Sequence, residues 1–413
     1  MTSPMTSPLA PAAAAEVVLD LTDAERTALR ADTPGIGHAY HFNSAGAALP
    51  SATVLRAVID HLQLEATTGG YEAAAAALPR LQAVYEAAAR VLGGQAEDIA
   101  LVESATVAWQ RAIDALRLSS GDRVLAASSS YVSSALNLLE LRRSRGVELE
   151  ILPIDATGQV DLAALRLALR RPARLVTVAH VPTSSGLVEP VAEVGALARA
   201  AGVPFLLDAT QSLGQLPVDA VAIGADLVVA TGRKFLRGPR GTGLLYANQA
   251  VRAAFPPLAP DVRGADWQAD ERFELDPGAR RYETWEASHA LRLGLGVALA
   301  ATLELGVPRI QRYLGARAGQ LRTGLAAITG LRVTDPPAGP AGPSGIVTFV
   351  RDGEDPWDTV QALRAAGFNL VSVPASHGQW DLGRRGLPAV VRASVHVYTE
   401  AADVAALLTE LER

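Results

Sequence analysis

Between residues 99 and 246 the sequence alternates short runs rich in Val, Ile and Leu with amphipathic segments rich in Ala, Leu and Arg. This alternation is typical of strand–helix–strand units, in which parallel strands form a sheet and helices cover its faces. Strands are predicted at residues 99–102, 123–127, 149–152, 174–179, 204–207, 226–230 and 243–246. The predicted fold class is therefore α/β, with a mainly parallel seven-stranded sheet flanked by helices.

The helices and the domain boundaries follow from the same periodicity. Apolar residues recur at three- and four-residue spacing in segments 106–118, 162–171 and 191–201, which predicts helices packed on the sheet. After about residue 300 the pattern changes to a long helix at 309–328, a Pro/Gly-rich loop at 335–345, a strand–helix–strand unit and a closing helix at 400–411. We expect a large domain over 61–299, a smaller α+β domain made of 36–60 plus 300–413, and a disordered or loosely ordered tail over 1–35.

Composition and charge exclude several classes of protein. Of the 413 residues, 49% are hydrophobic and 19% are charged, so the chain can bury a sizeable core and is not disordered throughout. The net charge of −6, without long blocks of either sign, argues against nucleic acid as the partner. We find no basic, apolar leader and no apolar stretch of about 18 residues, and we therefore expect no membrane span and a cytoplasmic location.

Two residue counts limit the possible chemistry. The sequence has no cysteine, which removes disulfides, thiolate metal sites and catalytic thiols together, and we predict no metal site. Among its 37 basic residues only Lys234 is a lysine. Arginine stays protonated above pH 12 and cannot replace a nucleophilic amine. Lys234 is therefore a candidate Schiff-base lysine on chemistry alone.

Polar residues follow five of the predicted strands, at residues 103–106, 128–131, 180–183, 208–211 and 231–234. Open α/β sheets bind ligands beyond the carboxyl ends of their strands, so we expect these residues to meet in one crevice with Asp208 and Lys234. Each segment has a plainer interpretation. Residues 128–130 read as an ordinary loop, and Ser104 or Thr106 reads first as the N-cap of the next helix. The glycines of 238–243 lead into a strand and not a helix, which disfavours a dinucleotide-binding turn.

Five segments in this order and spacing carry a family resemblance: LVESATVAWQRAI, HVPTSSGLVEPV, FLLDATQSLGQLPVD, ATGRKFLRGPRGTGLLYA and RASVHVY. Together they resemble the class V aminotransferase family of pyridoxal phosphate enzymes over about residues 38–400. This family includes cysteine desulfurases, selenocysteine lyases, isopenicillin N epimerase-like proteins and hercynylcysteine sulfoxide lyases. The resemblance implies fold type I, pyridoxal 5'-phosphate as cofactor, an amino acid substrate and a homodimer.

The resemblance also assigns roles to residues of the crevice. Lys234 would hold the cofactor and act as the base at Cα, Asp208 would pair with the pyridine nitrogen, and Gln211 would reach the phenolic oxygen. His180 stands at a family histidine near the cofactor and is a further catalytic candidate. Arg392 matches the arginine that receives the substrate carboxylate, which a forked guanidinium orients well.

Several remaining positions depart from the family pattern. The predicted phosphate cradle is made of Ser104, Ala105, Thr106, Thr231 and Arg233, where Thr231 and Arg233 replace the usual Ser and His. Tyr131 stands where desulfurases stack a histidine on the ring, and Thr183 stands where many relatives have an asparagine. The family's cross-dimer segment reads YETWEASHA here, which leaves Thr284 and Trp285 as candidates for contacts with a partner subunit.

The absence of cysteine limits the range of reactions that the chain can catalyse. A desulfurase that carries sulfur on its own thiol is excluded, whereas a C–S lyase that releases its sulfur-containing group directly is allowed. The segment GGYEAAAAALP resembles part of the hercynylcysteine sulfoxide lyases, and a β-eliminating C–S lyase is the first prediction. An aminotransferase or epimerase of a biosynthetic amino acid is the enzymatic alternative, and a cofactor-binding regulator is the non-enzymatic one.

Overall fold

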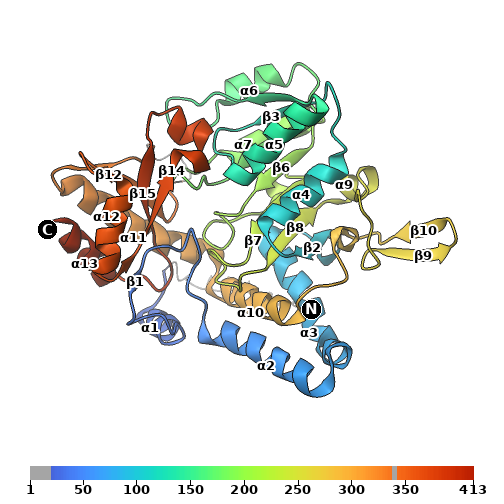
Figure 1. Cartoon of the computed structure of the whole chain (residues 1–413), viewed down its shortest axis with the longest axis horizontal. Coiled ribbons are helices and arrows are strands. Elements are labelled where there is room, and N and C mark those ends of the chain that lie inside the picture. Colours follow the sequence, from blue (N-terminus) through green and yellow to red (C-terminus); the bar gives the residue numbers. More distant parts are fainter. Residues whose placement is uncertain (1–19, 337–341) are drawn as a thin grey trace, which may run out of the picture.

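The computed structural model describes residues 20–336 and 342–413. The first 19 residues of the predicted tail and residues 337–341 of the predicted Pro/Gly-rich loop lie outside the described residues. Figure 1 shows a large sheet with helices on both faces beside a smaller layer formed by the C-terminal part of the chain.

The large sheet has seven strands in the order β2-β8-β7-β6-β5-β3-β4, and β8 is antiparallel to both its neighbours. The other pairings are parallel. The strands are β2 (Ile99–Val102), β3 (Arg123–Ala126), β4 (Glu148–Ile151), β5 (Leu175–Ala179), β6 (Phe205–Asp208), β7 (Leu227–Thr231) and β8 (Gly243–Ala247). The predicted fold class is confirmed, and each predicted strand lies within one residue of the observed one at both ends.

Both faces of this sheet are buried, which explains its near-continuous apolar strands. Along β3, Val124 and Ala126 belong to one hydrophobic cluster, whereas Leu125 belongs to the cluster on the opposite face. The alternation follows from the two-residue period of a strand. The covering helices are α4 (Ala105–Leu116), α5 (Val132–Arg145), α6 (Leu162–Ala168), α7 (Val191–Ala200), α8 (Ala220–Ile223) and α9 (Gln249–Ala254).

A second, antiparallel sheet of four strands has the order β11-β12-β15-β14. Its strands are β11 (Leu331–Val333), β12 (Ile346–Arg351), β14 (Val371–Pro374) and β15 (Ala389–Ser394), and its helices are α11 (Val307–Ala327), α12 (Pro356–Ala365) and α13 (Ala401–Leu411). The N-terminal β1 (Tyr40–His41) pairs with β13 (Phe368–Asn369) beside it. This pairing joins two distant parts of the chain, and the prediction assigns both of them to the small domain. The domain division itself stays a prediction, and α2 (Ala52–Thr68) runs across its boundary at residue 60.

The predicted loose tail is not observed at Asp23–Ala31, which forms α1. Thr22 and Glu25 make a reciprocal capping box at its start, and this satisfies N–H groups that a helix terminus leaves free. Glu25 also pairs with Arg309 of α11 at 2.6 Å. Local capping and this ion pair hold a helix where composition indicated disorder.

Three helices lie together along the lower part of Figure 1: α2, α3 (Gly70–Leu92) and α10 (His289–Leu305). A hairpin of β9 (Ala265–Ala269) and β10 (Arg272–Leu275), which the sequence did not predict, projects at the right of Figure 1, on the side of the large sheet where β2 and β8 lie. Short 3-10 or π turns occur at Ala96–Asp98, Ala279–Tyr282, Ala375–His377 and Gln379–Gly383. In the described residues no single helix is long and apolar enough to cross a membrane. Helices α10 and α11 pass that test of length and composition only as a pair, bent by 82° at the break between them.

The buried side chain of Glu283 links helices α3 and α10 to strand β2 of the large sheet. The Glu283 side chain is inaccessible to solvent and lies 3.2 Å from both Arg263 Nε and Arg292 Nη1. It also accepts hydrogen bonds from Tyr85 Oη at 2.8 Å and from the Leu101 N–H of β2 at 2.9 Å. Because Leu101 precedes the polar end of β2, this network fixes the strand that leads to the predicted phosphate cradle.

Removing the Glu283 carboxylate is expected to destabilise the protein strongly. Glu283→Ala leaves two arginines and a tyrosine hydroxyl without their buried partner, and such losses cost about 3–5 kcal/mol. Denaturant unfolding followed by fluorescence measures the change in the free energy of unfolding. The neighbouring exposed Glu286→Ala is the control and is expected to change it by less than about 0.5 kcal/mol. Equal stabilities of the two variants would contradict a structural role for the network.

Candidate active site

The ends of β5, β6 and β7 and the loop after β3 surround one pocket. Its lining residues are Ser129, Tyr131, Ala179, Val181, Thr183, Asp208, Thr210, Gln211 and Lys234. The predicted Tyr131, Thr183, Asp208, Gln211 and Lys234 are thus brought together at the carboxyl edge of the parallel strands.

Lys234 lies in a tight turn after β7 that holds its side chain inside the protein. Only 5% of the residue is exposed. The Arg237 N–H donates to the Lys234 carbonyl at 3.0 Å, and Arg237 itself has a left-handed φ of 61°. A non-glycine residue in this region is strained by roughly 1–2 kcal/mol. The Arg237 guanidinium donates hydrogen bonds to the Leu49 carbonyl and to Thr33 Oγ1, and these bonds stabilise the strained backbone conformation. The turn therefore holds Lys234 in a fixed position.

The electrostatics of Lys234 favour a reactive amine. Burial lowers its pKa to about 7, and repulsion from Arg233 and Arg392 acts in the same direction. Asp208 opposes the shift because a nearby negative charge favours the protonated amine. A substantial fraction of the amine is therefore neutral, and hence nucleophilic, near neutral pH.

Asp208 ends β6 and is 8% exposed. Its Oδ1 accepts a hydrogen bond from the Thr210 N–H at 2.9 Å. Burial raises the pKa of this carboxyl group, whereas Thr210 and Lys234 act to lower it. The short turn after β6 thus fixes a buried carboxylate beside the buried amine.

Arg392 of β15 reaches the pocket through Thr183. Its Nη1 donates to Thr183 Oγ1 at 2.6 Å and to the Thr183 carbonyl at 3.1 Å. Gln211 Nε2 lies 3.5 Å from the same hydroxyl and donates to the Ala45 carbonyl at 3.2 Å. Burial lowers the pKa of Arg392 to about 10, which still leaves the guanidinium charged at neutral pH. A cation from the small sheet therefore faces the wall of a pocket formed by the large sheet.

The predicted phosphate cradle lies around the start of β8. Arg233 Nη1 donates to Thr231 Oγ1 at 3.0 Å, and Thr231 pairs with Gly243 across β7 and β8. A Cβ atom at Gly243 would come within 2.5 Å of the Ser104 carbonyl carbon, so only glycine permits this approach. The close packing brings Thr231 and Arg233 near the N-terminus of α4.

Ser104 itself is the N-cap of α4, and its Oγ accepts from the Val107 N–H at 3.2 Å. The plainer interpretation of this serine is therefore what the structure shows. Ala105 and Thr106 are the first residues of the helix, where backbone N–H groups have no intrahelical partner and can receive an anion.

The remaining predicted residues lie in different surroundings. The Tyr131 ring is 5.8 Å from Lys234 Nζ. His180 does not line the pocket, whereas its neighbours Ala179 and Val181 do, and burial lowers the pKa of His180 to about 4. Trp285 is half exposed, and its backbone N–H donates a hydrogen bond to Asp261 Oδ1 at 2.7 Å. Neither Trp285 nor the adjacent Thr284 lines the pocket.

Ser129 and Thr210 also line the pocket. Both belong to the polar segments that follow the predicted strands, but neither is assigned a role from the sequence. Ser129 lies in the turn that follows β3, between the end of the strand and Tyr131, and this position after a strand was its signal in the sequence. Thr210 lies in the turn that fixes Asp208. Its position two residues after a carboxylate at the end of a strand was the only feature of the sequence that pointed to it.

Unpartnered polar atoms around Lys234 fit the predicted cofactor. Among the described residues, the buried atoms Ser129 Oγ, Thr210 Oγ1, Gln211 Oε1, Arg233 Nε and Arg392 Nε have no hydrogen-bond partner. Buried polar atoms are rarely left in this condition. The site holds an amine that suits an aldehyde and a buried carboxylate that suits a protonated pyridine nitrogen. It also holds an arginine that suits a carboxylate, and a second arginine with a helix N-terminus that suits a phosphate. The residues therefore fit pyridoxal phosphate.

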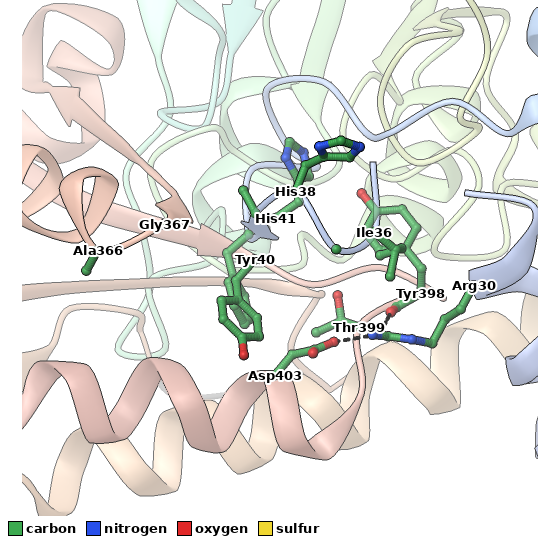
Figure 2. Close-up of a pocket in the computed structure, with 13 residues that line it drawn as sticks. Arg30, Ile36, His38, Tyr40, His41, Ala366, Gly367, Tyr398, Thr399 and Asp403 are labelled. Atoms are coloured by element: carbon green, nitrogen blue, oxygen red, sulfur yellow. Dashed lines mark hydrogen bonds and ion pairs between the residues drawn. The ribbon is translucent and has the colours of Figure 1, made fainter. Parts of the chain in front are cut away.

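A larger cavity of about 360 Å³ lies elsewhere, between residues 30–42 and two C-terminal segments, the turn before β13 and the start of α13 (Figure 2). Arg30 crosses one side of it and is held by Asp403 at 2.8 Å and by the Tyr398 carbonyl. Arg30 and Asp403 therefore pair with each other. The cavity is larger than the pocket around Lys234, but the described residues that line it offer no comparable set of unpaired reactive groups, and size alone does not make it an active site. No group of three or more His, Asp or Glu side chains suited to a metal ion occurs among the described residues.

Comparison with known proteins identifies the family. The model of the family Aminotransferase class-V matches residues 39–407. A probable cysteine desulfurase of Methanothermobacter thermautotrophicus is 28% identical, over 93% of this chain and 96% of the relative. A cysteine desulfurase of Yersinia pestis is also 28% identical, over 88% and 91% of the two chains.

Solved structures share the fold. The apo cysteine desulfurase of Thermococcus onnurineus superposes with a TM-score of 0.85 at 23% identity, over 94% of this chain and 97% of the other. The cystine C–S lyase C-DES in complex with cysteine persulfide superposes with a TM-score of 0.82 at 22% identity, over 92% and 99% of the chains. With the family model covering most of its length and a site that fits the cofactor, the chain belongs to the class V aminotransferase family and is a pyridoxal phosphate-dependent enzyme.

Proposed function

We propose that the enzyme is a C–S lyase that eliminates a sulfur-containing group from Cβ of a cysteine S-conjugate or sulfoxide. The observation that carries this proposal is the absence of cysteine in a chain whose relatives are named cysteine desulfurases. Without a thiol the chain cannot carry sulfur as its own persulfide. The likeness in fold to a cystine C–S lyase supports direct release of the leaving group.

In this proposal the three charged groups of the pocket have separate roles. Bound pyridoxal phosphate supplies an electron sink for the electron pair left at Cα. Lys234 takes the Cα proton, for which its lowered pKa and buried position suit it. Asp208 holds a proton on the pyridine nitrogen, and Arg392 pairs with the substrate carboxylate and so orients the Cα–H bond.

The other polar groups would bind the cofactor. Thr231 and Arg233, with the N-terminus of α4 at Ser104, Ala105 and Thr106, would hold its phosphate. The Tyr131 ring would stack on the pyridine face. The unpartnered Gln211 Oε1 and the nearby Thr183 hydroxyl would contact the polar edge of the ring.

A product assay tests the proposal. Purified holoenzyme is incubated with a panel of cysteine S-conjugates and their sulfoxides, and pyruvate, ammonia and the released sulfur species are measured. Stoichiometric pyruvate and ammonia are expected from at least one member of the panel. A keto acid that retains the sulfur group would instead show an aminotransferase, and an inverted amino acid would show an epimerase.

The role of Arg392 predicts a loss that charge alone does not explain. Arg392→Lys keeps a cation but cannot make two parallel hydrogen bonds to a carboxylate, and kcat/KM for the amino acid is expected to fall about 100-fold. Steady-state kinetics measure this fall. The cofactor should remain bound, because its phosphate is assigned to other residues.

The control for this prediction is Arg351→Lys on β12, whose guanidinium donates to the Leu411 carbonyl away from the pocket. This variant should keep wild-type kinetics. Comparison of a substrate with its decarboxylated amine completes the test. If wild type converts both equally and Arg392→Lys alters neither, Arg392 does not bind a carboxylate.

We also propose that the enzyme acts as a homodimer with Trp285 at the contact between subunits. The support is the half-exposed indole of Trp285 beside Thr284, since exposed aromatic residues favour interfaces. Sedimentation velocity should give twice the chain mass for wild type and a shift toward monomer for Trp285→Ala.

A further inference from the structure

A buried histidine that the proposed mechanism does not use lies between the small sheet and the turn that holds Lys234. His396 comes two residues after the end of β15 and is 2% exposed. The Thr399 N–H donates to the His396 carbonyl at 2.9 Å, and the His396 N–H donates to Thr399 Oγ1 at 3.0 Å. A turn closed by two hydrogen bonds therefore holds this imidazole directly after the strand that carries Arg392.

The two ring nitrogens of His396 make different hydrogen bonds. Nδ1 accepts from the Val397 N–H at 2.8 Å, and Nε2 lies 3.2 Å from the Phe235 carbonyl oxygen. A backbone N–H only donates and a carbonyl oxygen only accepts, so Nδ1 is unprotonated and Nε2 carries the hydrogen. Burial, with repulsion from Arg237, holds the pKa of His396 well below its ordinary value and keeps the ring neutral. His396 is thus a donor to the backbone next to Lys234.

Aromatic packing fixes the direction of this donor. The Phe235 ring stacks on the imidazole with centroids 5.7 Å apart and planes at 14°, and the Tyr398 ring stacks on it at 5.0 Å and 8°. Tyr398 is held in turn, because its Oη accepts from the Leu49 N–H at 3.1 Å. Stacked rings keep a defined orientation, so Nε2 of His396 stays directed at the Phe235 carbonyl.

The carbonyl groups on both sides of Lys234 accept hydrogen bonds from outside the large sheet. The preceding carbonyl, of Arg233, accepts from the N–H of Ala48, which lies before α2, at 2.9 Å. The following carbonyl, of Phe235, accepts from His396. The backbone that carries the amine is therefore held from two sides, and one of the two donors belongs to the segment that continues from the small sheet.

We propose that His396 is a positioning residue of the active site, whose Nε2–H fixes the Lys234 turn relative to Arg392 and so sets the base against the arginine that receives the substrate carboxylate. This inference rests on the proposed function, in which both groups act on one substrate. Lys234 follows β7 of the large sheet and Arg392 belongs to β15 of the small sheet. Hydrogen bonds between these two parts therefore decide how the Cα–H bond meets the amine, and a misplacement of about 1 Å lowers a rate about 100-fold.

Two substitutions separate the hydrogen bond from the ring packing. His396→Phe keeps a ring against Phe235 and Tyr398 but removes the donor, whereas His396→Gln loses the ring and can still donate through its amide. The first readout uses cofactor-free protein labelled with ¹³C-lysine. His396→Phe should raise the pKa of Lys234 above about 7, because a loosened turn admits water and burial is the main cause of the lowered value. His396→Gln should keep the wild-type value.

The matched control is His38→Phe, which replaces an exposed histidine and should leave the pKa of Lys234 unchanged. If His396→Phe titrates like wild type and His396→Gln does not, the ring serves packing alone and the proposal fails. Equal pKa values in all variants, or equal shifts in both His396 variants, would also overturn it.

The second readout is the kinetics of elimination. His396→Phe should lower kcat about 100-fold with KM within about threefold of wild type, because Arg392 still binds the carboxylate while the amine is displaced. Deuterium at Cα should slow this variant more than wild type, since removal of the proton becomes the slow step. His396→Gln should restore kcat by at least about tenfold over His396→Phe. A loss carried entirely by KM would refute the positioning role.

The two readouts separate this inference from the proposed function. If wild type releases pyruvate and kcat is the same in both variants, the elimination stands and the role of His396 fails. If wild type releases no pyruvate from the panel, the elimination fails, and the lysine titration still decides whether His396 holds the Lys234 turn.

A measurement on wild type covers the case in which His396→Phe does not fold. Spectra of protein labelled with ¹⁵N-histidine should show a neutral ring with its hydrogen on Nε2, and the signal that is missing in His396→Gln identifies it as His396. A hydrogen on Nδ1, or a ring that is protonated at neutral pH, would overturn the proposal.

Discussion

Lys234→Ala is expected to abolish turnover, with kcat reduced by at least about 10⁴-fold. The substitution removes the only side-chain amine of the chain, and no arginine can replace it as a nucleophile or base. Borohydride reduction of the wild-type holoenzyme should attach one pyridoxyl group to the peptide that contains Lys234. The variant should show no labelled peptide by mass spectrometry.

The matched control is Arg240→Ala, which removes an exposed cation from the same segment of chain. Arg240 repels Arg233 but lies outside the pocket lining, so turnover and labelling should stay within about twofold of wild type. A labelled side chain other than Lys234, or a Lys234→Ala protein with near wild-type turnover, would contradict the assignment of this residue.

The large sheet was predictable because its strands are buried on both faces. Runs such as 204–207 and 226–230 are apolar almost throughout, and polar residues begin where each strand leaves the sheet. The same boundary located Asp208, since the carboxylate stands at the last position of β6. Fold and site were thus encoded by one pattern, apolar strand followed by polar turn.

Other elements depend on contacts that no local pattern reveals. Helix α1 is held by an ion pair between Glu25 and Arg309, which are distant in sequence. In the hairpin of β9 and β10, Trp267 pairs with Phe273, yet both rings are exposed, so the usual alternation of buried and exposed residues is missing. The hairpin has no apolar face turned to the core. Helix α1 has no fully buried residue and contacts the core through the partly buried Leu29, so periodicity gave little signal for either element.

In the site, too, some residues could be predicted from the local sequence, whereas others depend on contacts that form only in the fold. Ser129 reads as part of a serine-rich loop, because the pocket that it lines forms only when β3 pairs with β5 and the ends of both strands come together. His180 is a catalytic candidate because it stands at a family histidine near the cofactor, but Ala179 and Val181 on either side of it are the residues that line the pocket. Residue type predicted the chemistry of the site, whereas strand alternation decides which side chains enter it.

Asp208→Asn is expected to lower kcat about 10²–10³-fold while the protein still folds and binds its cofactor. The amide is close in shape to the carboxylate and can keep the hydrogen bond from the Thr210 N–H, but it carries no charge to hold a proton on the pyridine nitrogen. Charge placed where a reaction needs it contributes on this scale. Single-turnover kinetics with an eliminating substrate measure the loss. Asp226→Asn is the control, because Asp226 caps the Phe205 N–H at the opposite end of β6 and should leave kcat unchanged.

The same substitution has an effect that needs neither cofactor nor substrate. Asp208 raises the pKa of Lys234 by attraction, so its removal should move that pKa below the wild-type value of about 7. Because the chain has a single lysine, protein labelled with ¹³C-lysine gives one side-chain signal to titrate by NMR. A downward shift in Asp208→Asn and none in Asp226→Asn would place the charge of Asp208 at the amine. If the lysine signal titrates identically in all three proteins, Asp208 does not act on Lys234, and its place at the strand end is that of an ordinary turn residue.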